Sequence, residues 1–152
     1  MQFRGERRCF LRAAMAVAAA GMLPPARACE YVLDTLRVTH PWSRATELGA
    51  HSAVLGMTID DVRQADRLIE VRTPIADGAE LAAAPGQPLD LWFLPGTTVE
   101  LSETGRHVRL VGLKRQLHTA RDYPLELVFE KGGVVSTRLT VDQIALPTFR
   151  FR

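Results

Sequence analysis

The stretch "YPLELVFEKGGVVSTRLTV", residues 123–141, decides the fold class. Leu125, Leu127 and Phe129 alternate with other residues before a Gly-Gly pair, and the same alternation resumes after it at Val135, Thr137, Leu139 and Val141. A period of two is typical of β-strands, and two glycines accept the positive φ angles of a tight hairpin turn. The stretch therefore predicts a hairpin that pairs residues near 125–131 with residues near 134–141.

Short runs with the same period fill the chain upstream, separated by Gly, Pro, Asp and Ser. With the two hairpin arms they comprise residues 31–38, 50–59, 67–73, 89–94, 97–102, 107–113, 125–131 and 134–141. Many short strands at such spacing favour a β-sandwich or barrel. The sequence shows no internal repeat and no linker, so we expect one all-β domain.

Residues 1–28 have the form of a cleaved export signal. A basic front precedes an apolar run from Ala13 to Leu23, and Ala26-Arg27-Ala28 is an A-x-A cleavage pattern. The apolar run is too short for a membrane span, which needs about 20 residues. Within it "ERRCFLR", residues 6–12, matches the twin-arginine export motif, with the general secretory route as the alternative.

We therefore expect a periplasmic domain over residues 29–152, with no transmembrane segment and Cys29 as its first residue. Ala26 and Arg27 fit a lipoprotein signal poorly, so we expect no lipid anchor at Cys29.

The charge balance changes when the leader is removed. The whole chain has 19 basic and 17 acidic residues, and residues 1–28 hold five of the basic ones and one acidic one. The remaining chain thus has a net charge of −2, which argues against nucleic acid as a partner.

Five segments, in the same order, resemble the PCuAC family of periplasmic copper chaperones. They are "HPWSRAT" at 40–46, "AVLGMTID" at 53–60, "RLIEVRTPIADGAEL" at 67–81, "LPGTTVELSETGRHVRLVGLK" at 94–114, and residues 123–141. The resemblance implies a cupredoxin-like β-sandwich that handles copper(I).

The resemblance also implies a ligand set of two histidines and two methionines, which suits copper(I) because thioether sulfur is a soft ligand. The first histidine of that set falls at Ala82 in this sequence, and the first methionine falls at about Pro85 or is deleted with a shortened hairpin. At the positions of the later His-x-Met pair, this sequence has His107 and Arg109. His107 is therefore the one family ligand of four that is present.

Composition supports the same interpretation. Met57 is the one methionine outside residues 1–28, so a single chain without its leader cannot provide two thioethers. Residues i and i+2 of a strand point the same way, so Arg109 would place a positive charge near His107 and disfavour a metal cation there.

His107 is the best metal candidate, and a strand histidine without a ligand role is the alternative. A relocated site could combine it with His40 or His51, whereas Met57 fits the core better than a metal site. Trp42 and Trp92 could line a pocket, although large aromatics more often fill a sandwich core.

Two functions remain open. The first is a copper-chaperone-like protein whose copper(I) binding and delivery to a periplasmic protein are weakened or lost. The second is a metal-free module that binds a periplasmic protein partner through Ala82, Ala83 and Ala84. No nucleophile, metalloprotease or phosphate-loop motif occurs, so we expect no enzymatic activity.

Overall fold

The computed structural model describes residues 29–142. The expected export signal, residues 1–28, lies outside the described residues. The described chain forms strands and loops with no helix, and therefore contains no helix able to span a membrane. Its ten strands are β1 (Glu30–Val32), β2 (Arg37–Arg44), β3 (Ser52–Asp60), β4 (Asp66–Arg72), β5 (Gly78–Leu81), β6 (Leu91–Phe93), β7 (Val99–Leu101), β8 (Val108–Val111), β9 (Asp122–Phe129) and β10 (Gly133–Asp142).

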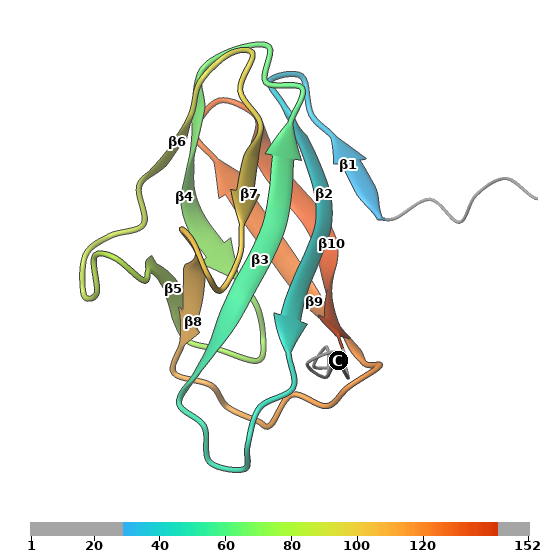
Figure 1. The fold of residues 1–152 in the computed structure, drawn as a ribbon, viewed down its shortest axis with the longest axis vertical. Helices are drawn as coiled ribbons and strands as arrows, with labels where there is room; N and C mark the ends of the chain where they lie inside the picture. Colours follow the sequence, from blue (N-terminus) through green and yellow to red (C-terminus); the bar gives the residue numbers. More distant parts are fainter. Residues whose placement is uncertain (1–28, 143–152) are drawn as a thin grey trace, which may run out of the picture.

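The strands are hydrogen-bonded in the order β5-β8-β3-β2-β10-β9-β4-β6, with β1 beside β2 and β7 beside β3. β2 and β10 pair in parallel, and the other pairs in the described residues are antiparallel. The sheet curls, so that β2 and β3 lie in front of β9 and β10 in Figure 1. The expected all-β sandwich is confirmed.

The inward-facing residues of β3 and β9 form the centre of the core. Leu55, Met57 and Ile59 of β3 belong to one buried cluster with Leu125, Leu127 and Phe129 of β9. These are alternate positions of each strand, as expected for residues that face the same side of a sheet. The period-two pattern therefore places the core correctly on both strands.

The predicted terminal hairpin is confirmed, with Phe129 opposite Gly133 and Tyr123 opposite Leu139. The two glycines have different roles. Gly133 adopts a φ of 81°, which favours glycine. Gly132 is needed for close approach, because a Cβ there would lie 2.8 Å from the Thr35 hydroxyl oxygen.

A buried carboxylate fixes this turn. Asp66, at the start of β4, is 0% exposed. It accepts hydrogen bonds of 2.8–2.9 Å from the Thr35 hydroxyl and from the backbone amides of Arg67, Lys131 and Gly132. Every donor is an uncharged group, so the network binds β4 to the β9–β10 turn without an ion pair.

The two tryptophans do not fill the core, contrary to the sequence-based preference. Trp92 is 46% exposed. Trp42 lies half-buried against Gly56, where a Cβ would come within 2.2 Å of its ring. Leucine, isoleucine, valine and phenylalanine fill the core instead, and the indoles cover outer surfaces of the sheet.

Candidate metal site

The metal corner, as we call residues 80–83, 90–92 and 105–109, lies where β5 pairs with β8. Leu81 is opposite Val108, and the Ala82 amide donates a 3.1 Å hydrogen bond to the His107 carbonyl. The two positions at which the resemblance implies histidine ligands are therefore neighbours in space. Figure 1 shows β5 beside β8, at the edge from which the connection to β6 projects.

A cavity of about 360 Å³ opens at this corner. Its lining residues are Leu81, Ala82, Ala83, Asp90, Leu91, Trp92, Gly105, Arg106 and His107. His107 supplies the only imidazole among them, and no thioether lines the cavity. His107 is half-buried, and its Nδ1 lies 3.1 Å from the Gly105 carbonyl oxygen. When Nδ1 donates to that oxygen, Nε2 keeps the lone pair that a metal would use.

Arg109 occupies the other position of the His-x-Met pair and shares the outward face of β8 with His107, since Val108 and Leu110 are buried. Its guanidinium does not carry an unbalanced charge. Arg109 Nε lies 3.1 Å from Glu80 Oε1, and Nη2 makes a second, shorter contact with the same oxygen. The expected repulsion between Arg109 and a metal cation is therefore offset by Glu80.

Glu80 also shapes the connection between β5 and β6. Its Oε2 accepts a 2.7 Å hydrogen bond from the Gly86 amide, and Gly86 adopts a φ of 76°. The Gly86 amide and, to a lesser degree, Arg109 hold the pKa of Glu80 below its ordinary value. Glu80 is thus a charged acceptor whose two oxygens are both engaged within the protein.

The other sequence candidates lie away from this cavity's lining. His40, at the irregular part of β2 with a φ of 48°, places Nε2 3.3 Å from Asp142 Oδ2 on β10. His51 is exposed before β3, and Met57 is 1% exposed in the core opposite Leu101. Within residues 29–142, no three His, Cys, Asp or Glu side chains are arranged to hold a metal ion.

Trp92 also belongs to this corner, as a pocket-lining residue rather than the core residue that the sequence favoured. Its indole lines the cavity, and the Arg67 guanidinium on β4 lies 5.3 Å from its ring centroid. Arg67 is held in turn by Glu130 at 2.8 and 3.0 Å and by Asp90 at 3.2 Å. The two neighbours of Trp92, Leu91 and Phe93, face the core, so the indole faces outward.

Solved structures similar to this chain include PCuAC domains. The copper-bound PCuAC domain from PmoF2 matches with a TM-score of 0.69 and 26% identity, covering 76% of this chain and 99% of that domain. The apo PCuAC domain from PmoF1 gives a TM-score of 0.68 and 27% identity, covering 76% of this chain and all of that domain. The copper(I) form of DR1885 from Deinococcus radiodurans, at 22% identity, gives a TM-score of 0.57 and covers 85% of each chain.

The resemblance to the PCuAC copper chaperone family is thus confirmed, and two of these structural neighbours are copper forms. The family model of LpqE-like lipoproteins matches residues 36–141. The chain belongs to this LpqE-like family. A search of curated proteins found no match.

Proposed function

We propose that this protein is an exported, non-enzymatic copper-chaperone-like protein that binds copper(I) weakly at the metal corner. The hydrogen bond between the Ala82 amide and the His107 carbonyl carries the proposal. This hydrogen bond supports equating the corner with the place where the resemblance implies the ligands. His107 is the one imidazole there, whereas the resemblance implies four ligands.

The chemistry of the remaining groups argues for weak binding. Copper(I) prefers thioether, thiolate and imidazole ligands. The cavity around His107 offers alanine, leucine and indole surfaces, and the carboxylate of Glu80 is engaged by Arg109 and Gly86. A copper(I) ion at His107 would therefore have one soft ligand from this chain and would need the rest from elsewhere.

Copper(I) titration against a competing chelator tests the proposal on three proteins. They are the natural protein, Arg109→Met, and a graft that adds a family-length hairpin with histidine at position 82 and methionine across it to Arg109→Met. We expect the natural protein to bind copper(I) weakly, Arg109→Met to bind slightly more tightly, and the graft to bind one copper(I) ion tightly. Binding by the natural protein as tight as that of the graft would contradict the proposal.

The source of any residual affinity is tested by His107→Ala, with His51→Ala as the matched control on an exposed histidine outside the cavity lining. We expect His107→Ala to abolish residual copper(I) binding and His51→Ala to leave it unchanged. An equal loss in both variants would assign the copper to scattered surface histidines.

One observation favours a second candidate function, a metal-free module that binds a periplasmic protein. Trp92 is 46% exposed beside Ala82 and Ala83 in the cavity, and exposed indoles are common anchors of protein interfaces. The copper titration separates the two functions. Weak binding that depends on His107 supports the first, and complete absence of binding in a folded protein supports the second.

A further inference from the structure

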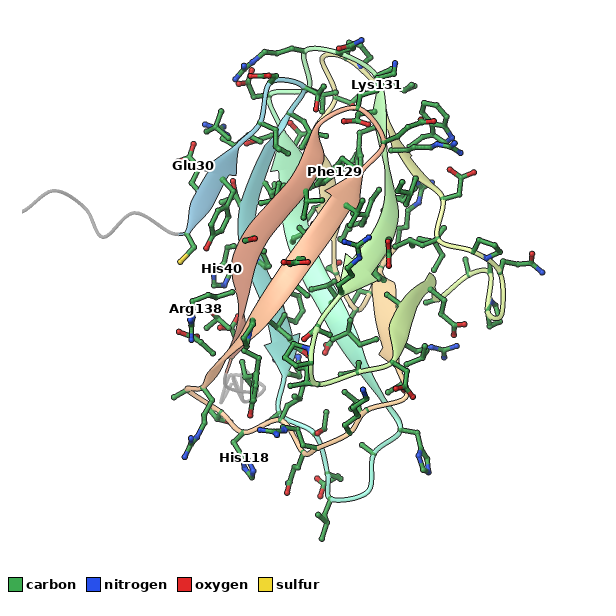
Figure 2. All side chains as sticks on the ribbon, turned by 180° about the vertical axis from the view of Figure 1, so that it is seen from behind. Glu30, His40, His118, Phe129, Lys131 and Arg138 are labelled. Carbon is green, nitrogen blue, oxygen red and sulfur yellow. The ribbon has the colours of Figure 1, made fainter. Side chains whose placement is uncertain are left out.

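A second cavity, of about 440 Å³, lies at the connection between β8 and β9, outside the metal corner. Its lining side chains are Lys114, Arg115, Gln116, His118, Arg121 and Tyr123. Every one of them can donate a hydrogen bond, three are permanently cationic, and none is a carboxylate. Such a lining selects for an anion. Figure 2 shows His118 at the end of the molecule opposite Lys131.

The first half of this connection is held firmly by the β2–β3 loop. Leu117 is 0% exposed and acts as an apolar anchor. Its amide donates to the Thr46 hydroxyl at 2.9 Å, and its carbonyl accepts from the Thr46 amide at 3.1 Å. The Gln116 side-chain amide donates to the Thr46 carbonyl at 2.9 Å. The adjoining cationic residues therefore extend from a fixed backbone.

The second half is tied to β10 and to Tyr123. The Ala120 amide donates to the Val141 carbonyl, and the Val141 amide donates to the Arg121 carbonyl, both at 3.0 Å. Tyr123 is 8% exposed, and its hydroxyl oxygen accepts a 3.3 Å hydrogen bond from the His118 amide. Because that oxygen acts as an acceptor, the hydroxyl proton is left to donate to a ligand.

The charges of the cavity are not cancelled by nearby acids. Within residues 29–142, neither Arg115 nor Arg121 forms an ion pair. Lys114 Nζ lies 3.4 Å from Asp77 Oδ1, and this pair is more than half exposed. The carboxylate of Asp122 is 3.8 Å from Arg138 Nε, which draws it toward β10. Two guanidinium groups thus remain for a ligand.

We propose that this cavity, the basic pocket, binds a phosphate group, carried either by a small molecule or by a lipid headgroup. A guanidinium donates two parallel hydrogen bonds to a phosphate. A carboxylate can be bound by one such fork, whereas this lining offers two guanidinium groups together with Lys114, His118 and the Tyr123 hydroxyl, enough donors for the several oxygens of a phosphate. The pocket is independent of the metal corner, so its test does not depend on copper.

The decisive variant is Arg115→Ala with Arg121→Ala, and the matched control is Arg63→Ala with Arg72→Ala, which removes two exposed arginines elsewhere. Binding of inorganic phosphate to the purified protein is measured by calorimetry at low salt. We expect the decisive variant to weaken binding by about tenfold or more, since charge-assisted hydrogen bonds are strong, and the control to stay near the natural value. Equal losses in both variants, or no binding by the natural protein, would overturn the proposal.

Vesicles identify the carrier of the phosphate. The natural protein is mixed with phosphatidylglycerol vesicles and, separately, with phosphatidylcholine vesicles. Retention on the anionic vesicles that is displaced by inorganic phosphate and lost in the decisive variant supports a lipid headgroup. Binding of free phosphate without retention supports a small molecule. Binding of polyglutamate but not of phosphate would replace the phosphate by a carboxylate partner and overturn the proposal.

Discussion

Two carboxylates, Asp66 and Glu80, each accept hydrogen bonds from the backbone of a turn, and they do so in opposite environments. Asp66 has no exposed surface and accepts four hydrogen bonds, all from uncharged donors. The Glu80 side chain is 13% exposed and pairs with the Arg109 guanidinium while it accepts from the Gly86 amide.

The comparison teaches which end of the sandwich tolerates change. At the Asp66 end, a substitution leaves three part-buried amides and the buried Thr35 hydroxyl without this acceptor, so the turn and the carboxylate depend on one another. At the Glu80 end the ion pair with Arg109 is partly exposed, and the turn contributes one amide, that of Gly86. We therefore expect this end to tolerate substitution better.

The largest effect is expected for Asp66→Ala. The substitution leaves the part-buried amides of Lys131 and Gly132 and the buried Thr35 hydroxyl without this acceptor. We expect a loss of about 3 kcal/mol in the free energy of unfolding. Urea denaturation measures it, with the exposed Asp34→Ala as the control. A loss as small as that of the control would show that Asp66 contributes no more to stability than an exposed carboxylate does.

The second expected effect is a pH dependence. Burial by itself disfavours the charged form of Asp66, but the four hydrogen bonds outweigh it and hold the pKa below its ordinary value of 3.8. A depressed folded pKa means that the stabilisation is complete above the unfolded pKa and is lost as the pH falls through the folded pKa.

The difference in unfolding free energy between the natural protein and Asp66→Ala should therefore be constant above about pH 5 and shrink below the ordinary pKa. Taking this difference removes the contribution of the other carboxylates, which titrate in both proteins. A difference that stays constant down to pH 2.5 would show that the charge of Asp66 is not what the turn requires.

The sequence predicts most of the strands but not these carboxylate contacts. The predicted run 31–38 is divided between β1 and β2, and β5 is not among the predicted runs. The hairpin of residues 123–141 is readable because alternation and Gly-Gly are local signals. The meeting of Ala82 with His107 followed from the family resemblance. The Asp66 network and the Glu80–Arg109 pair join segments that are distant in the sequence, so they depend on strand register, which composition and spacing do not reveal.

The sequence also left the position of Trp92 open between a pocket and the core. The pattern of Leu91, Trp92 and Phe93 fits a strand with either face inward, and only the pairing of β6 with β4 decides it. The basic pocket is similar, because the residues between 114 and 123 are a polar connection in sequence and become one surface through contacts with Thr46 and Val141.

The smallest effect is expected for Glu80→Gln, which sharpens the comparison at its weak end. Glutamine keeps an acceptor for the Gly86 amide but removes the charge that balances Arg109. Partly exposed ion pairs contribute little to stability. We expect the thermal midpoint to change much less than in Asp66→Ala. The change should be close to that of Glu70→Gln, which breaks the exposed pair with Arg72.

Glu80→Gln should also lower the residual copper(I) affinity of His107, because the Arg109 charge is no longer offset. Calorimetric melting and the competitive copper titration measure the two outcomes. Unfolding comparable to that of Asp66→Ala would show that the metal corner is as tightly coupled to the fold as the β9–β10 turn.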